Sequence, residues 1–330
     1  MTETTAFELA IAELLADAAG GHPTVHHDAV ASAGATRSTH FVSIDDVPAV
    51  VQLRHRTSEL QMSSAATEVA VIRAAAEAGV PVAGPIAAGR VDALDADAIV
   101  TERRFGETIP RRVLRATPPG TAAARRLASD CGRALAHTHR VRGSALTTLD
   151  ELPRHTAASY LEHLHHLLDE LPSAQPALRY GLVALAERLP AEPTPTLVHG
   201  DFRNGNLLVA DAGLDAVLDW ELAHIGHPME DVAWLCLRTW RFGEDDHPVG
   251  GFGDIDDLRT AYIEAGGEWD PNAIRWWTIA RTIWWGAGLA TQAAGFLRGD
   301  TDSLVHAASG RRVVELDYDL LQLLGDDHGP

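Results

Sequence analysis

The sequence predicts an α+β fold in two unequal parts, a small β-rich part followed by a larger and mostly helical one. The chain has 330 residues, of which 46% are hydrophobic and 22% charged, so it is able to bury a substantial core. Short runs rich in β-branched residues recur in the first third, whereas long patterns with helical spacing dominate the rest. We therefore divide the chain into a sheet-containing lobe, residues 1–103, and a helical lobe, residues 104–330.

The first lobe combines helices with short strands. Residues 6–18 have apolar positions at helical spacing, and residues 64–78 form a second helical pattern that Gly79 and Pro81 close. Runs of β-branched residues between turn formers predict the strands, at 25–31, 40–44, 47–53, 85–91 and 98–101.

The second lobe is expected to be helical except for one insert. Helical spacing covers residues 120–139, 156–171, 175–189, 254–265, 272–294 and 303–324. The insert contains three short apolar strands, at 196–198, 207–209 and 216–218. It also holds most of the polar residues that are candidates for chemistry.

Composition excludes several classes of function. The formal net charge is −19, and a nucleic-acid-binding protein needs a basic face to neutralise phosphates. All 27 basic residues are arginine, which excludes a Schiff-base lysine or a Walker lysine. The sequence has no apolar stretch long enough to span a membrane and carries acids near its start, so we expect a cytoplasmic protein that binds neither membranes nor nucleic acid. Cys131 and Cys236 lie in apolar helical patterns and are expected to be free thiols.

Three polar residues follow strand ends in the insert. Asp201 and Asn206 lie in the loop HGDFRNGN between the first two strands, and Asp219 follows the third strand. Phosphoryl transfer needs a carboxylate that accepts the proton of the attacking hydroxyl, and oxygen ligands for the magnesium that bridges the nucleotide phosphates. Protein kinases have an Asn five residues after the catalytic Asp and a metal-binding Asp after the next hairpin, and this spacing is met here.

The motifs HGDFRNGN, LDWE and HPMEDVAWL resemble those of the aminoglycoside phosphotransferase and choline kinase superfamily, in particular the branch fused to acyl-CoA dehydrogenases. The resemblance implies a protein-kinase-like bilobal fold, with Mg²⁺ as cofactor and ATP or GTP as phosphate donor. It also implies that Asp201 is the catalytic base and that Asn206 and Asp219 bind the metal. His199 and Asp231 would then support the loop structurally.

The same resemblance assigns nucleotide-binding residues in the first lobe. Gly34 and Ser38 would belong to a turn over the phosphates, and Arg54 would replace the usual lysine, with Arg56 as an alternative. Glu68 would be either the ion-pair partner of Arg54 or a solvated residue on its helix. Glu102 and Arg104 would delimit a linker whose backbone pairs with the base.

The sequence leaves the acceptor open. An aminoglycoside would suit the acidic surplus, and a hydroxyacyl thioester would suit the fused branch. Tryptophans at helical spacing form either core or the wall of an acceptor pocket, namely Trp276, Trp277, Trp284 and Trp285. The loop from Phe242 to Gly253 is a candidate lid. A non-catalytic nucleotide-binding pseudokinase is the alternative that the absence of lysine supports.

Overall fold

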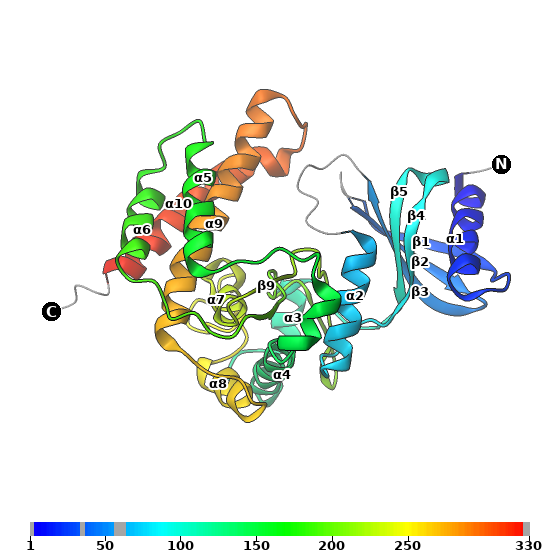
Figure 1. Cartoon of the computed structure of the whole chain (residues 1–330), viewed down its shortest axis with the longest axis horizontal. Coiled ribbons are helices and arrows are strands. Elements are labelled where there is room, and N and C mark those ends of the chain that lie inside the picture. The colour runs from blue at the N-terminus through cyan, green and yellow to red at the C-terminus, as the bar shows by residue number, and fades with distance from the viewer. Residues whose placement is uncertain (1–2, 34–36, 56–63, 326–330) are drawn as a thin grey trace.

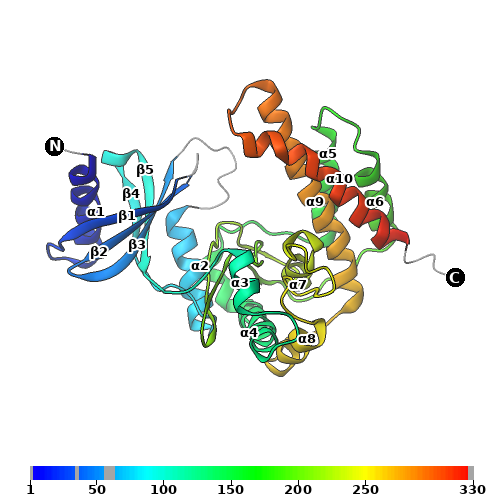
Figure 2. The same cartoon turned by 180° about the vertical axis from the view of Figure 1, so that it is seen from behind.

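The computed structural model describes residues 3–33, 37–55 and 64–325. The chain forms two lobes that lie side by side, with the sheet and helix α1 at one end and helices α5, α6 and α10 at the other (Figures 1 and 2). The predicted turn residue Gly34 and the alternative cation Arg56 lie outside the described residues.

A five-stranded sheet forms the core of the N-lobe. Its strands are β1 (Val25–Ala33), β2 (Arg37–Ile44), β3 (Val47–His55), β4 (Pro85–Val91) and β5 (Ala96–Glu102). The order in the sheet is β1-β2-β3-β5-β4, and every neighbouring pair is antiparallel. Strand β2 begins three residues before the expected start at His40, which brings Arg37 into the sheet.

The two faces of this sheet are covered by different helices. Helix α1 (Glu3–Ala19) packs Ile11 against Val42 and Val100, and helix α2 (Ala65–Glu77) packs Val69 against Ile99. Successive residues of a strand point to opposite faces, so Ile99 and Val100 serve different cores. Figure 1 shows the sheet between the two helices.

Helix α2 also reaches the C-lobe. Its Val71, Ile72 and Ala75 belong to the large hydrophobic core of the helical lobe. At its other end, the Thr67 hydroxyl donates a hydrogen bond of 2.6 Å to Glu151. Although sequence assigns α2 to the N-lobe, it therefore spans both lobes, and this fixes the position of Glu68 relative to the C-lobe.

The C-lobe is mostly helical, as expected. Its α-helices are α3 (Pro110–Ala116), α4 (Ala122–Thr138), α5 (Ala157–Asp169), α6 (Pro176–Glu187), α7 (Met229–Cys236), α8 (Ile255–Glu264), α9 (Pro271–Arg298) and α10 (Leu304–Gly325). Short 3-10 helices occur in both lobes, at η1 (Asp92–Leu94), η2 (Gly143–Leu149) and η3 (Arg238–Trp240). Helices α3 and α7 were not expected, because each is too short to show several turns of helical spacing.

Two small antiparallel ribbons lie inside the C-lobe. Strand β6 (Thr196–Val198) pairs with β9 (His224–Gly226), and β7 (Leu207–Ala210) pairs with β8 (Gly213–Val217). The unexpected strand β9 holds β6 in place at the point where the candidate catalytic loop begins. The predicted lobe boundary between residues 103 and 104 falls in the linker that joins β5 to α3.

Other expectations concern single segments. In the described part of the chain, no helix combines the length and the apolar character needed to cross a bilayer. Cys131 and Cys236 are free, and burial raises the pKa of both thiols. The second half of the candidate lid is anchored, because Val249 and Phe252 are fully buried. Only its first half, around Glu244, is exposed enough to move.

Candidate active site

The loop after β6 is held by its backbone. Gly200 has a φ of +80°, and a Cβ at this position would collide with the Leu222 carbonyl oxygen, so only glycine fits. The Asp231 carboxylate accepts hydrogen bonds from the N–H groups of His199 at 2.7 Å and Gly200 at 2.9 Å. It also accepts one from the His139 imidazole at 3.3 Å. Asp231 thus binds the loop from helix α7 without reaching the reaction site.

Burial of Asp231 opposes its charged form, but the hydrogen bonds from the His139 side chain and from the backbone N–H of His199 favour that form. The pKa of Asp231 is therefore lowered. A carboxylate that stays charged can keep accepting both backbone N–H groups.

His199 braces the same loop. Its Nδ1 accepts a hydrogen bond of 3.1 Å from the Asp201 N–H, and its Nε2 donates one of 3.1 Å to the Leu218 carbonyl. The ring also packs on Trp220, with the ring centroids 4.4 Å apart. Burial lowers the pKa of His199, which favours the neutral tautomer that this pair of bonds requires. His199 therefore connects the Asp201 loop to the strand end that carries Asp219.

The Asp201 carboxylate is fixed from three sides. Oδ1 accepts hydrogen bonds from Arg203 Nε at 2.9 Å and Trp234 Nε1 at 2.8 Å, and Oδ2 accepts one from Asn206 Nδ2 at 2.6 Å. The side chain is 13% exposed, so it remains reachable. Arg203 and Trp234 were not among the predicted site residues.

Backbone hydrogen bonding places Asn206 beside the strand end that carries Asp219. The N–H of Leu218 donates a hydrogen bond of 2.8 Å to the Asn206 carbonyl, and β7 pairs Leu207 with Val217 of β8. Because the Asn206 amide nitrogen is engaged by Asp201, its Oδ1 is the atom left to bind a cation. Magnesium typically takes one or two protein oxygens and completes its shell with phosphate oxygens and water. The Asn206 and Asp219 oxygens fit this requirement, although the described residues contain no cluster of three or more His, Cys, Asp or Glu side chains suited to a metal.

The cleft face of the N-lobe sheet carries two arginines. Arg54 on β3 forms an ion pair with Glu68 of α2, which answers the open question about Glu68. Arg37, which lies opposite Arg54 in the β2–β3 register, also pairs with Glu68, at 3.2 Å, and forms an ion pair with Asp219. Burial, and secondarily the charge of Arg37, lower the pKa of Arg54 to about 10. Arg37 was missed as a site residue because the expected strand began after it.

Ser38 points the other way. Its hydroxyl hydrogen-bonds His40 at 2.9 Å, and the His40 ring lies 4.8 Å from the ring of Phe7 in α1. Strand alternation therefore places the Ser38 side chain on the α1 face and Arg37 on the cleft face. The Ser38 side chain therefore lies on the face away from Arg37, and a contact between the backbone at Ser38 and the phosphates stays a prediction.

The linker begins at the end of the sheet. The N–H of Glu102 donates to the Gly84 carbonyl at 2.8 Å, and the N–H of Arg103 donates to the Pro48 carbonyl at 3.3 Å. A nucleotide base could thus receive a linker N–H from Arg104 or a later residue. The Arg104 side chain turns to the β7–β8 ribbon and pairs with Asp215 at 3.0 Å, so it ties the linker to the C-lobe.

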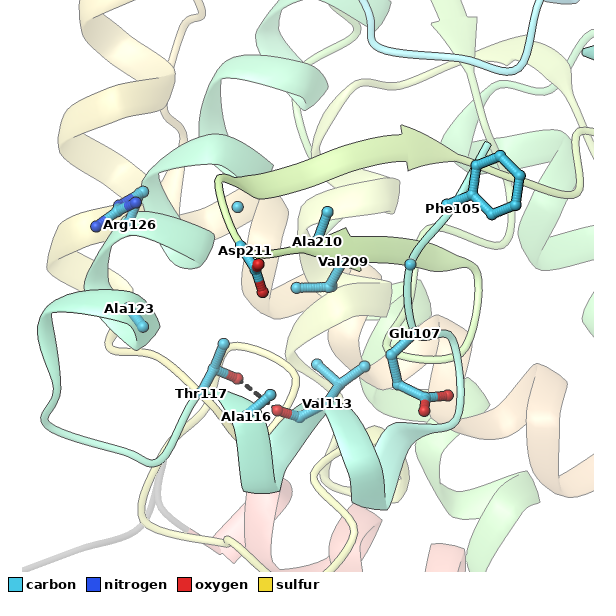
Figure 3. Close-up of a pocket in the computed structure, with 12 residues that line it drawn as sticks. Phe105, Glu107, Val113, Ala116, Thr117, Ala123, Arg126, Val209, Ala210 and Asp211 are labelled. Carbon is cyan, nitrogen blue, oxygen red and sulfur yellow. Dashed lines mark hydrogen bonds between the residues drawn. The ribbon is translucent and has the colours of Figure 1, made fainter. Parts of the chain in front are cut away.

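A cavity of about 530 Å³ lies on the C-lobe side of this linker. Figure 3 shows it between the linker, helix α3, the start of α4 and the β7–β8 ribbon, with Glu107, Thr117 and Arg126 among its lining residues. Neither Asp201 nor Asp219 lines this cavity, so it is separate from the candidate active site.

Helix α9 contributes a buried cation that was not predicted from the sequence. Arg281 is 3% exposed, and its guanidinium donates to Glu230 at 2.9 Å and to the Gly200 carbonyl at 2.6 Å. It also lies over the rings of Trp234 and Trp284, at 4.1 and 4.3 Å from their centroids. An arginine in the middle of an apolar stretch of this helix is the sequence signal that could have revealed it, since a buried charge needs a buried partner.

Tryptophans surround this part of the site. Trp276 and Trp277 are core residues, whereas Trp284 and Trp285 pack against Trp234, with ring centroids 5.5 and 6.0 Å away. The Trp240 ring completes the group, and the Arg203 guanidinium lies 4.5 Å from its centroid. Aromatic rings and arginine thus flank Asp201 on the side away from the N-lobe sheet.

Comparison with known proteins supports the fold and the family. A candidate aminoglycoside phosphotransferase from Ralstonia eutropha superposes with a TM-score of 0.74 at 22% identity, covering 98% of both chains. A spectinomycin phosphotransferase solved with ADP and spectinomycin gives a TM-score of 0.64 at 12% identity, over 94% of this chain and 98% of that one. These likenesses confirm the predicted bilobal kinase-like α+β fold.

A curated relative matches over a shorter segment. Acyl-CoA dehydrogenase family member 10 of Mus musculus is 44% identical over 70 residues, which are 21% of this chain and 6% of that protein. The predicted resemblance to the branch fused to acyl-CoA dehydrogenases is thereby confirmed. A sequence model of the phosphotransferase enzyme family matches residues 29–277, which include both strands of the arginine pair and the whole catalytic insert. The chain belongs to the phosphotransferase enzyme family.

Proposed function

We propose that this protein is a small-molecule kinase that transfers the γ-phosphate of a nucleotide, ATP or GTP, to a hydroxyl group, with Asp201 as the catalytic base. The observation that carries the proposal is the threefold hold on the Asp201 carboxylate by Arg203, Trp234 and Asn206. A base must keep one orientation toward the acceptor hydroxyl to contribute to catalysis. Asp201 would orient the hydroxyl and accept its proton as the phosphoryl group transfers.

Asn206 Oδ1 and the Asp219 carboxylate would hold magnesium in this reaction. The cation would neutralise charge on the nucleotide phosphates, which is the main requirement of a loose phosphoryl-transfer transition state. Asp219 is 30% exposed at its side chain and can therefore accept a ligand from the cleft.

The nucleotide would bind between the lobes. We assign the phosphate-binding cation to Arg54, because the ion pair with Glu68 resembles the lysine–glutamate pair that kinases use to position phosphates. Gly34 remains the predicted phosphate turn, and the backbone around Glu102 and Arg104 the predicted base contact. A cytoplasmic location, where nucleotides are abundant and Cys131 and Cys236 stay reduced, fits such a donor.

A pseudokinase remains the alternative, and the replacement of lysine by Arg54 is the feature that favours it. Arginine keeps its charge and offers a planar fork to phosphate oxygens, so the replacement alone does not imply loss of activity. The shared hold on Asp201 by Asn206 and Trp234 favours the active enzyme, since a protein that only binds nucleotide has no need to orient a base.

For the acceptor, we favour a hydroxylated molecule with an apolar body, such as a hydroxyacyl thioester, over a polyamine such as an aminoglycoside. Trp240 and Trp285 have buried indole N–H groups that lack a hydrogen-bond partner among the described residues. An N–H group donates only, so these groups can bind an oxygen atom of the acceptor but cannot bind an ammonium group. Arg203, whose positive charge lies over the Trp240 ring, would also repel a polyamine.

The acids that would attract a polyamine are mostly engaged. Glu230 is fully buried and paired with Arg281 and His224. Asp245 pairs with Arg238 at 2.9 Å, and Glu221 lies 3.7 Å from Arg37. Glu244 and Asp246, on the exposed half of the loop after α7, would be accessible to such an acceptor.

The proposal is tested by incubating the protein with Mg²⁺ and ATP or GTP and with panels of hydroxyacyl thioesters, aminoglycosides and macrolides, and detecting phosphorylated product by mass spectrometry. Asp201→Asn keeps the size of the side chain and one acceptor oxygen but removes the base, so it should lower kcat by about 10²–10⁴-fold. Asp211→Asn, an exposed change in the β7–β8 turn, is the matched control. Transfer at an undiminished rate by Asp201→Asn would refute the catalytic assignment. Nucleotide binding without transfer to any panel member would favour the pseudokinase.

A further inference from the structure

Arg37 lies where three carboxylates meet. From the first residue of β2 it forms ion pairs with Glu68 of the N-lobe at 3.2 Å, with Asp219 of the C-lobe, and with Glu221 at 3.7 Å. Its side chain is 16% exposed and that of Glu68 is 2% exposed, so this pair is shielded from solvent, whereas Asp219 and Glu221 are 30% and 48% exposed. Arg37 thereby connects the sheet to the strand end that carries the proposed metal ligand.

The charges explain why a cation is needed at this point. Glu68, Asp219 and Glu221 carry negative charge, and Arg54, which is also buried, is paired with Glu68. Asp219 and Glu221 repel each other as like charges, and without Arg37 this repulsion would be opposed by one positive charge fewer, with Arg54 left near both. The guanidinium of Arg37 thus performs, in the protein without nucleotide, the neutralising task that a divalent cation would perform in the complex.

We propose that Arg37 is a positioning residue that competes with the divalent cation for Asp219. When the metal and the nucleotide bind together, the Arg37 guanidinium leaves Asp219 and forms an ion pair with a phosphate oxygen of the donor instead. This inference rests on the proposed function, because it assumes that Asp219 binds the metal of a nucleotide complex. Arg37 is suited to the exchange, since its planar fork binds carboxylate and phosphate in the same geometry. Arg54 stays on Glu68 throughout.

The exchange makes metal and nucleotide depend on each other. A metal ion alone must displace Arg37 from Asp219 and leave the guanidinium without that carboxylate. A metal ion that binds together with a nucleotide brings phosphate oxygens, to which Arg37 can donate hydrogen bonds instead. Binding of metal and nucleotide should therefore be cooperative, and by linkage the cooperativity is the same whichever ligand binds first.

The test measures binding, not turnover. Mn²⁺, which takes similar oxygen ligands to Mg²⁺ and is detected by electron paramagnetic resonance, is titrated into the protein with and without ADP. Arg37→Gln removes the competing charge, so it should bind Mn²⁺ alone about tenfold more tightly, a change of about 1.4 kcal/mol. The same variant should bind ADP with Mn²⁺ about tenfold more weakly and lose most of the cooperativity.

Two matched variants separate this effect from others. Arg90→Gln makes the same change of net charge on the exposed surface of β4, where Arg90 pairs with Asp92 at 3.0 Å, and should leave both affinities unchanged. Arg37→Lys keeps the charge and should bind Mn²⁺ alone as the wild type does. Equal tightening in Arg37→Lys and Arg37→Gln would overturn the inference, because it would trace the effect to packing and not to charge.

Failure of the inference differs from failure of the proposed function. If wild-type protein shows no Mn²⁺-dependent binding of ADP, and Asp219→Asn changes nothing, the metal assignment and the proposed function fail together. If the wild type binds Mn²⁺ and ADP at Asp219 but Arg37→Gln leaves the affinity for Mn²⁺ alone unchanged, only the competition by Arg37 is refuted.

Discussion

Arg281 offers a direct test of how the candidate catalytic loop is held. Its guanidinium is fully enclosed and supports the Gly200 carbonyl, the residue immediately before Asp201, while neutralising Glu230. Replacing Arg281 by Met preserves most of the apolar stem and removes the charge and the hydrogen bonds. The variant should unfold more easily and hold Asp201 less firmly.

The structure allows the size of the effect to be worked out. Removing one partner of a buried ion pair costs about 3–5 kcal/mol, because the other charge is left without compensation. Here Glu230 keeps a hydrogen bond of 3.0 Å from His224, which places the cost near the lower limit. The lost hydrogen bond to the Gly200 carbonyl adds about 1 kcal/mol. We therefore expect the free energy of unfolding of Arg281→Met to fall by about 3–4 kcal/mol.

Urea unfolding followed by tryptophan fluorescence measures this change, with circular dichroism as the second probe of a single transition. Arg298→Met, at the exposed end of the same helix, is the control, and its ion pair with Asp300 should contribute less than about 1 kcal/mol. The double variant Arg281→Met with Glu230→Gln should recover about 1–2 kcal/mol, since it no longer leaves a charge in the core. A loss below about 1 kcal/mol for Arg281→Met would refute the reasoning, because the pair could then not be the buried support that we describe.

Three further predictions concern the nucleotide and the pH dependence. Asp219→Asn should abolish most of the rise in melting temperature that Mg²⁺ and ADP produce together, as measured by thermal shift, and an undiminished rise would place the metal elsewhere. Arg54→Met should raise the KM for the nucleotide about tenfold or more, in steady-state kinetics, whereas Arg54→Lys should restore most of the affinity; an unchanged KM in Arg54→Met would assign the phosphates to another residue. Burial lowers the pKa of His227 to about 4, below the value of about 6.5 in the unfolded chain, so the unfolded state binds the proton more readily and stability should fall as the pH drops from about 6.5 towards 4. The His227→Asn variant can still accept a hydrogen bond from the Met229 N–H. Its free energy of unfolding, measured with urea, should fall by about 1–2 kcal/mol less than that of the wild type between pH 7 and 5. An equal fall in both proteins would mean that His227 does not titrate in this way.

Sequence reasoning recovered the elements whose signal is local. The strand ends that carry Asp201 and Asp219 were identified, because short apolar runs followed by Asp and Asn at fixed spacing are visible in the chain itself. The ion-pair partner of Arg54 could be named as Glu68, but not decided, since the pair joins a strand of the sheet to a helix. Its presence depends on how α2 packs, and α2 is fixed by the core of the other lobe.

The sequence analysis missed residues whose contacts in the site are far from them along the chain. Arg281 lies 81 positions from the Gly200 carbonyl that it supports, and Arg37 lies 182 positions from Asp219. Neither has a neighbour in sequence that reveals its partner. Ser38 was assigned because its segment resembles a phosphate-binding turn, but alternation along β2 places the Arg37 side chain, and not that of Ser38, on the face that carries Arg54. A strand that begins three residues earlier than expected was enough to hide Arg37.

The arrangement around α9 has a consequence for how acceptor preference could vary without loss of catalysis. The same helix carries Arg281, which supports the catalytic loop through Gly200, and Trp284 and Trp285, which flank the proposed acceptor side. Arg281 also lies over the rings of both Trp234 and Trp284, so the loop support and the aromatic wall share one guanidinium. Replacing Trp285, which does not contact Arg281, can therefore reshape the wall while the loop keeps its support, whereas replacing Trp284 changes both at once. Acceptor specificity in this chain should accordingly respond to changes at position 285 more freely than at position 284.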